Sequence, residues 1–326
     1  MNTFDEIIGN ESVKLHLKNS IKMQKTSHAY IFEGEKGMGK RFMADSFAKA
    51  LQCEAGEENP CNKCSSCIAA DSQNHPDIIY VKPTNKTGFG VDDIREQINT
   101  DIFTKPYKYR YKIYIVEEGD KMTEQAQNAL LKTLEEPPQY GIIMILTENL
   151  DKLLSTIISR CVHIALKPLK QSEVKEYLEK NQEMNSSSAH IYAALSRGNI
   201  GKARMYIEEQ EFEEIRLMAI NAIEAVINKD DLAILEVANT ISLNKEKSDM
   251  MIEIFLTWLR DLLIVKELKE ENNIIHKDKL KTLLKQGEGI AYNRICALIS
   301  RLIEIQEIMK VHVNYQLAIE TLLFEC

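Results

Sequence analysis

The sequence contains no uninterrupted apolar run of the roughly 18 residues that a membrane-spanning helix needs. Its most apolar stretch, residues 252–265, is interrupted by Glu253, Arg260 and Asp261. The first residues also lack a basic segment followed by an apolar one, so we expect no secretory signal. These absences predict a cytoplasmic protein that has no membrane partner.

Basic residues are in deficit, with 41 Lys and Arg against 49 Asp and Glu and a net charge of −8. Binding to nucleic acid depends mainly on neutralising phosphates, so the chain is unsuited to bind DNA on its own. Proline is absent after Pro168, although seven prolines occur up to that point. This change in composition predicts a domain boundary near residue 168.

The first part of the chain alternates short apolar runs with helical patterns, which predicts a parallel α/β sheet. A helix is expected where apolar and small residues recur between Ala126 and Leu134, and Pro137 and Pro138 should end it. Five strands are expected: Ala29–Phe32, Ile78–Val81, Ile113–Val116, Ile142–Leu146 and Val162–Leu166.

The part after Pro168 has helical periodicity throughout. The expected fold class is therefore α/β plus all-α, with domains at 1–168, 169–209 and 210–326. Helices are expected from Ser172, over Ser186–Leu195, Ile200–Glu209, Phe212–Ile227, Asp249–Leu268 and Ile290–Lys310, with breaks at Arg197–Asn199 and Gly287–Gly289.

A glycine-rich segment directly follows the first expected strand and precedes a helical run over Phe42–Leu51. It reads G-x-x-x-x-G-K, the pattern of a phosphate-binding loop, or P-loop, whose backbone N–H groups surround a phosphate. Its candidate phosphate-binding residues are Gly34, Gly37, Gly39 and Lys40.

Two positions depart from what Mg²⁺ binding requires. A Ser or Thr hydroxyl normally follows the P-loop lysine and binds the metal, but Arg41 stands there. The strand over 113–116 ends in Glu117 and Glu118, whereas an Asp usually supports the metal at the first position. Glu118 could still polarise water. We expect the site to accept ATP or ADP, to hold Mg²⁺ poorly, and to be ill equipped for hydrolysis.

Four of the seven cysteines, Cys53, Cys61, Cys64 and Cys67, lie within fifteen residues. In a cytosolic chain this spacing is typical of a closed structural zinc site. Iron–sulfur ligation uses similar spacing, but the surrounding residues are polar and would shield a cluster poorly. Structural Zn²⁺ is the favoured interpretation, and His75 is expected to lie in a turn.

Several motifs together resemble the AAA+ clamp-loader subunits of bacterial DNA polymerase III. They are Phe4–Glu11, Ser27–Tyr30 before the P-loop, the cysteine insert after the P-loop helix, residues 125–138 (QAQNALLKTLEEPP), and Ser159-Arg160-Cys161. The resemblance covers essentially the first 168 residues, whereas the helical remainder is similar in layout only.

The resemblance implies that Arg160 is an arginine finger acting in a neighbouring subunit's ATP site. Motor subunits of the family, gamma or tau, carry a phosphate-sensing arginine where Gly201 stands here, and Thr147 or Asn149 matches a first polar sensor. The resemblance therefore implies a stationary ring member. Its implied partners are gamma/tau and delta subunits, a sliding clamp and, through the assembled ring, primed DNA.

Two alternatives and two ambiguous features remain. The chain could be a self-sufficient AAA+ motor ATPase or, without sequence support for an acceptor lid, a P-loop kinase. Residues 105–112 mix basic and aromatic side chains, as single-strand binding surfaces do, but are interpreted as a loop entering a strand. An apolar stripe at Trp258, Leu259, Leu262 and Leu263 is either a docking surface or core.

Overall fold

The structure, a computed structural model, describes residues 3–85, 88–228, 232, 245–267 and 273–309. The chain forms two compact units, Met1–Leu169 and Lys170–Cys326. Within the described residues, none of the helices is long and apolar enough to cross a membrane.

The first unit is built on five parallel strands in the order β2-β3-β4-β1-β5. Each strand coincides with one of the five predicted apolar runs to within about one residue, because buried parallel strands are nearly continuous in Val, Ile and Leu. The bounds are β1 (Ala29–Glu33), β2 (Ile78–Val81), β3 (Lys112–Val116), β4 (Gly141–Thr147) and β5 (Val162–Ala165).

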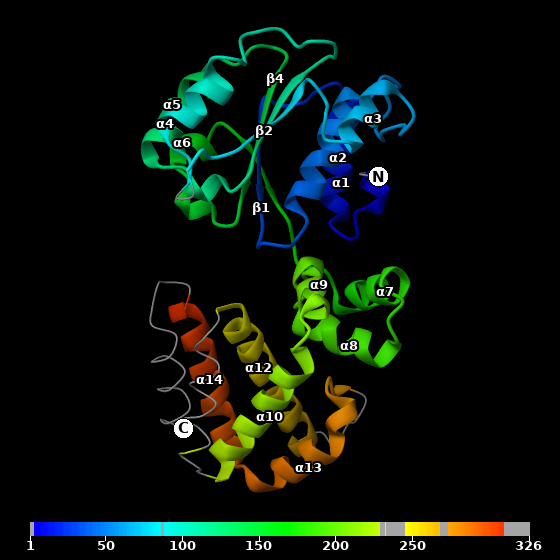
Figure 1. Ribbon diagram of the computed structural model, residues 1–326, viewed down its shortest axis with the longest axis vertical. Helices are drawn as coiled ribbons and strands as arrows, with labels where there is room; N and C mark the ends of the chain where they lie inside the picture. Colours follow the sequence, from blue (N-terminus) through cyan, green and yellow to red (C-terminus); the bar gives the residue numbers. More distant parts are fainter. Residues whose placement is uncertain (1–2, 86–87, 229–231, 233–244, 268–272, 310–326) are drawn as a thin grey trace. The chain divides into compact units, whose positions relative to one another are not determined.

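Helices cover both faces of this sheet, with α1, α2 and α3 on one side and α4, α5 and α6 on the other (Figure 1). Alternate side chains of β1 serve the two faces: Tyr30 and Phe32 pack in one core, Ala29 and Ile31 in the other. The helices are α1 (Glu11–Lys22), α2 (Lys40–Gln52), α3 (Ser65–Asp71), α4 (Val91–Ile94), α5 (Glu124–Glu135) and α6 (Ser155–Ile158).

Short turns complete this unit. They are the 3₁₀ helices η1 (Phe4–Glu6), η3 (Gly119–Lys121) and η4 (Leu150–Lys152) and the π-helical turn η2 (Arg95–Asn99).

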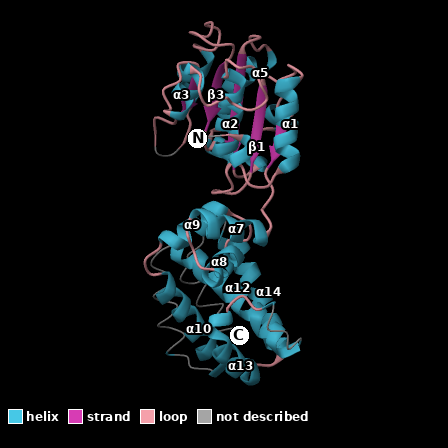
Figure 2. Ribbon diagram, turned by 90° about the vertical axis from the view of Figure 1, so that its right-hand side faces the viewer, coloured by secondary structure: helices cyan, strands magenta, loops and turns pink. Residues whose placement is uncertain are grey.

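The second unit is helical throughout its described residues (Figure 2). One apolar core runs from Ile191 to Leu302 and includes residues of every described α-helix of this unit except α7. The elements are α7 (Gln171–Asn181), α8 (Ser186–Leu195), α9 (Ile200–Glu208), α10 (Phe212–Asn228), α12 (Lys245–Glu267), η6 (Lys277–Lys279), α13 (Leu280–Gly289) and α14 (Tyr292–Met309). The predicted division between 209 and 210 stays a prediction.

The expected fold class, an α/β P-loop domain followed by helices, is thus confirmed. No bounds were predicted for α1, α3, α4, α6 or α13. The predicted break at Gly287–Gly289 is instead the last turn of α13. Residues 268 and 310, the ends of two predicted helices, lie outside the described residues.

The docking interpretation of the Trp258 stripe is wrong. Trp258, Leu259 and Leu262 are buried in the core of the second unit, and Leu263 packs against that core. The Trp258 indole N–H donates to Gln286 Oε1 at 2.8 Å, so even its polar atom has an internal partner.

Candidate functional site: a P-loop with an internal cation

The P-loop connects the carboxyl end of β1 to the start of α2, which places it at the edge of the sheet where α/β proteins bind ligands. Gly37 and Gly39 have φ angles of 91° and 87°, which favour glycine because it lacks a Cβ. Gly34 begins the loop, and its N–H donates to the Thr147 carbonyl at the end of β4. The sequence prediction of a strand–loop–helix motif is confirmed in its geometry.

Lys40, the first residue of α2, turns its ammonium back into the loop and donates to the carbonyls of Gly34 and Glu35. Burial lowers the pKa of Lys40, while the nearby carboxylates of Glu148, Asp120 and Glu35 oppose that shift. The lysine thus lies where a phosphate group would enter the loop.

Arg41, the residue in place of the metal-binding hydroxyl, is held by acidic groups. Its Nη1 lies 2.7 Å from Glu117 Oε1 at the end of β3, and its Nε lies 3.6 Å from Asp45 Oδ2 one helical turn further along α2. The guanidinium also lies over the Tyr80 ring, 4.8 Å from its centroid. The two positions that depart from the metal-binding pattern are therefore joined in one ion pair.

Asp45 and Tyr80 were not predicted as site residues. The Tyr80 hydroxyl donates to Asp45 Oδ1 at 3.0 Å, and burial raises the pKa values of both groups. The contact between Asp45 and Arg41 could have been predicted from the sequence, since residues four apart on a helix lie on the same face. The contact of Tyr80 with this site could not have been predicted, because sequence alone does not show that β2 lies beside β3.

The other predicted residues at this edge have local partners. The Glu118 carboxylate pairs with Lys121 at 2.9 Å. Thr147 is buried next to the start of the P-loop, and its hydroxyl donates to the Asn149 carbonyl. Asn149 caps η4 through the N–H of Asp151.

Arg160 lies at the opposite, amino edge of the sheet, two residues before β5 begins. Its Nη2 is 2.7 Å from Glu135 Oε1 at the end of α5, and its Nη1 donates to the Thr156 carbonyl. The side chain keeps 35% of its surface exposed. Because Val162 pairs with Tyr30, three residues before Glu33, the sheet separates this edge from the P-loop by about 10 Å at about 3.3 Å per residue.

Candidate metal centre

The four predicted cysteines meet in one cluster, with all four sulfurs within 4.8 Å of one another. Cys53 follows α2, Cys61 lies in the loop, Cys64 caps α3, and Cys67 lies in the first turn of α3. Backbone N–H groups point at the sulfurs: Cys61 N to Cys53 Sγ at 3.3 Å, and Cys67 N to Cys64 Sγ at 3.4 Å. Such donors stabilise thiolate, the form that binds metals.

The donor set fits a metal ion. Zn–S bonds of about 2.3 Å in a tetrahedron place sulfurs about 3.8 Å apart, within the spread observed here. Backbone N–H groups of Lys63 and Cys64 lower the pKa of Cys61 to about 6, whereas burial raises the pKa values of Cys53 and Cys67. The four thiols would supply a complete structural site with no open position.

His75 does not join this cluster and lies in the turn before β2. Its Nε2 pairs with the Ser66 hydroxyl at 3.1 Å, and its Nδ1 accepts from the N–H of Asp77 at 3.1 Å. It therefore links α3 to the start of β2, as a turn residue would.

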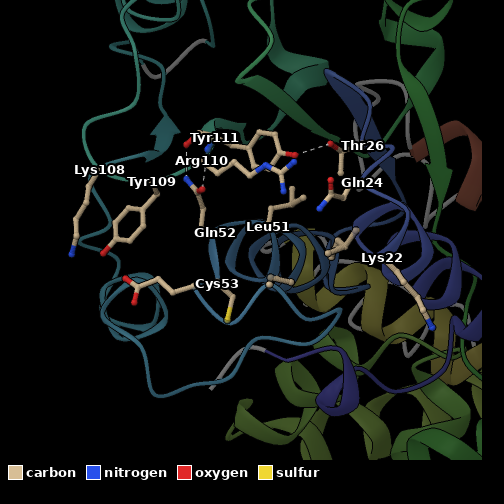
Figure 3. Close-up of a pocket in the computed structure, with 14 residues that line it drawn as sticks. Lys22, Gln24, Thr26, Leu51, Gln52, Cys53, Lys108, Tyr109, Arg110 and Tyr111 are labelled. Atoms are coloured by element: carbon tan, nitrogen blue, oxygen red, sulfur yellow. Dashed lines mark hydrogen bonds between the residues drawn. The ribbon is translucent and has the colours of Figure 1, made fainter.

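The basic, aromatic segment before β3 is fixed by a buried carboxylate. Asp77 accepts N–H groups from Tyr107, Lys108 and Tyr109, the last two at 3.0 Å. Figure 3 shows Gln52 bonded to Tyr111 beside a pocket lined on its other side by the end of α1. The segment is an ordered entry into the strand, as the loop interpretation expected.

In the second unit, two basic residues near Gly201, Arg197 and Lys202, form ion pairs with the same carboxylate. Glu253, which is buried, lies 2.6 Å from Arg197 Nε and 3.2 Å from Lys202 Nζ. Lys202 therefore has a partner within its own unit.

These features define the class of the protein: a P-loop-type α/β unit, with altered metal-binding residues and a tetracysteine insert, joined to a helical unit. Comparison with known families then gives a more specific placement. Residues 9–170 match the family described as DNA polymerase III, delta subunit, and residues 210–326 match its C-terminal counterpart.

Individual proteins similar to this chain are subunits of the same enzyme. The chain is 30% identical over 304 residues to the delta-prime subunit of DNA polymerase III from Bacillus subtilis (strain 168), covering 92% of this chain and 91% of that protein. It is 37% identical over 177 residues to the tau/gamma subunit of Haemophilus influenzae, covering 54% of this chain but only 25% of that longer protein. The chain belongs to the delta-prime family of DNA polymerase III clamp-loader subunits.

Among solved structures, a gamma subunit-related protein of Thermotoga maritima is similar over 96% of this chain and 97% of that one. Its sequence identity is 21% and its TM-score 0.45.

Proposed function

We propose that the chain is a stationary member of the clamp-loader ring, which lends Arg160 to the ATP site of a neighbouring motor subunit. The observation that carries this proposal is the position of Arg160 at the edge of the sheet opposite its own P-loop. An arginine there is too far from its own P-loop to contact a phosphate bound in it, and with 35% of its side chain exposed it is accessible to a neighbouring subunit.

The altered P-loop supports the stationary role. A motor subunit needs a hydroxyl after the lysine and an acidic residue free to support Mg²⁺. Here both functions are replaced by the Arg41–Glu117 ion pair. Lys202 pairs with Glu253, and the neighbouring Gly201 offers no side chain that could sense a γ-phosphate. The P-loop would therefore bind ATP or ADP as a structural ligand.

The remaining assignments follow from this role. The cysteine cluster would hold one structural Zn²⁺, residues 169–209 would form a lid, and residues 210–326 would form a collar that assembles the ring. Gamma/tau and delta subunits are the proposed partners, and the ring would open a sliding clamp and place it on primed DNA in the cytoplasm.

The test is the clamp- and DNA-stimulated ATPase rate of a reconstituted loader that carries this chain as wild type or as Arg160→Ala. Arginine fingers supplied by a neighbour contribute on the order of 10³-fold or more to the rate, so we expect a loss of about that size with assembly intact. Arg95→Ala is the matched control, since Arg95 is an exposed arginine of the same unit.

Two results would contradict the proposal. One is a rate unchanged by Arg160→Ala. The other is Mg²⁺-dependent turnover by the isolated chain that Lys40→Ala abolishes, which would identify a motor ATPase instead.

A further inference from the structure

The acidic groups that would hold a metal ion at this P-loop already hold a side-chain cation. Glu117 reaches Arg41 Nη1 at 2.7 Å, and Asp45 and Tyr80 flank the same guanidinium. The side chains of Asp45 and Glu117 are 10% and 28% exposed, so this pairing is partly shielded from water. The Arg41 guanidinium therefore occupies the position between α2 and the end of β3, where a P-loop protein would hold its metal ion.

Mg²⁺ does not fit this set of groups. The ion requires near-octahedral oxygen ligands at about 2.0–2.1 Å and is usually held by the P-loop hydroxyl together with the strand-end acid. Arg41 offers N–H donors and no acceptor, and its positive charge would repel a cation drawn to Glu117. Binding the metal would require breaking the Arg41–Glu117 pair and leaving both groups to find new partners.

The guanidinium is suited to phosphate instead. Its planar N–H groups match two phosphate oxygens, and it keeps its charge at every physiological pH. Arg41 is the second residue of α2, directly after Lys40, and 40% of its side chain is exposed. Two cationic residues thus stand in the first turn of a 13-residue helix, directly after the loop.

We infer that this P-loop binds the phosphates of a nucleoside di- or triphosphate without Mg²⁺, with the Arg41 guanidinium in place of the metal ion. The inference rests on the nucleotide-binding role proposed above but not on the role of Arg160. It also gives a reason for both departures from the motif at once, since the longer Glu117 reaches the guanidinium.

The test is equilibrium binding of fluorescent ADP and ATP analogues to the full chain, in excess Mg²⁺ and in EDTA. For the wild type we expect dissociation constants that agree to within about threefold, which corresponds to less than about 1 kcal/mol. In EDTA, Arg41→Thr should weaken binding about tenfold or more, whereas Arg110→Ala, which removes an exposed arginine elsewhere, should not. Lys40→Ala should weaken binding in both conditions.

The double variant Arg41→Thr/Glu117→Asp restores the usual metal-binding residues, so Mg²⁺ should tighten its binding about tenfold or more. Wild-type binding that is tenfold tighter in Mg²⁺, no wild-type binding in either condition, or an Arg41→Thr variant that binds normally in EDTA would each overturn the inference. None of these results would alter the expected loss of ATPase rate in Arg160→Ala, so the two proposals fail separately.

Discussion

The two edges of the sheet each hold an arginine in an ion pair, but only one of these arginines lies beside the chain's own P-loop. At the carboxyl edge, Arg41 pairs with Glu117 beside the chain's own P-loop. At the amino edge, Arg160 is exposed to a similar extent and pairs with Glu135. The presence of an arginine therefore does not by itself identify a phosphate-binding site. The edge of the sheet on which the arginine lies determines whether it can contact a phosphate bound to its own subunit.

The edges also differ in how they are built. The carboxyl edge is assembled from charged side chains at the ends of strands. The amino edge carries the tetracysteine module, the buried Asp77 and the segment that Asp77 orders. This difference predicts that damage to the tetracysteine module or to Asp77 will be structural, whereas changes at the P-loop will alter ligand binding and leave the fold intact.

The largest structural effect is expected on removing metal from the cysteine cluster. Structural zinc sites contribute several kcal/mol or more, so Cys61→Ser/Cys64→Ser should expose residues 53–76 to hydrogen exchange. Residues 34–45 around the P-loop should keep their protection, because they lie at the other edge. Cys296→Ser, in α14 of the second unit, is the matched control.

Elemental analysis of protein purified without chelator should find about one zinc per chain. Iron in place of zinc would contradict the zinc assignment. A P-loop that loses protection together with the cysteine module would contradict the separation of the two edges.

Asp77→Ala should have the next largest effect. The carboxylate is buried and accepts three backbone N–H groups, so its loss leaves these donors unpaired and should reduce the free energy of unfolding by about 2–3 kcal/mol. Denaturant unfolding measures this change. Asp77→Asn retains an acceptor oxygen and should lose less unfolding free energy. Asp92 is exposed, so an equal loss of unfolding free energy in Asp92→Ala would show that the buried contacts of Asp77 have no special role.

The smallest effect is expected at the partner of Arg160. Glu135 competes with any incoming phosphate for the guanidinium, but both side chains are substantially exposed, and such pairs contribute at most about 1 kcal/mol. Glu135→Gln should therefore raise the stimulated ATPase rate of the loader by about two- to fivefold, while the neighbouring Glu136→Gln leaves it unchanged. A tenfold fall would mean instead that Glu135 positions Arg160.

Much of this fold could be predicted from local signals. All five strands were found, because runs such as Ile113–Val116 are apolar and rich in β-branched and aromatic residues. The P-loop and the cysteine cluster were also found, since their ligands lie close together in sequence. The short α3 was missed, because its residues serve the cysteine cluster and carry little amphipathic pattern.

The partners within the sites could not be predicted in the same way. The Arg41–Glu117 contact joins residues 76 positions apart and depends on where β3 lies relative to α2. The burial of the Trp258 stripe likewise depends on how α13 packs against α12, where Gln286 accepts the Trp258 indole N–H. Strand order and helix packing supply this information, and neither can be read from spacing along the chain.

A structure of the assembled loader bound to an ATP analogue would show where Arg160 acts. We predict that Arg160 leaves Glu135 and lies about 3 Å from the γ-phosphate in the neighbouring subunit, while Arg41 remains in this chain's own P-loop. A structure in which Arg160 stays paired with Glu135 and faces no phosphate would contradict this prediction.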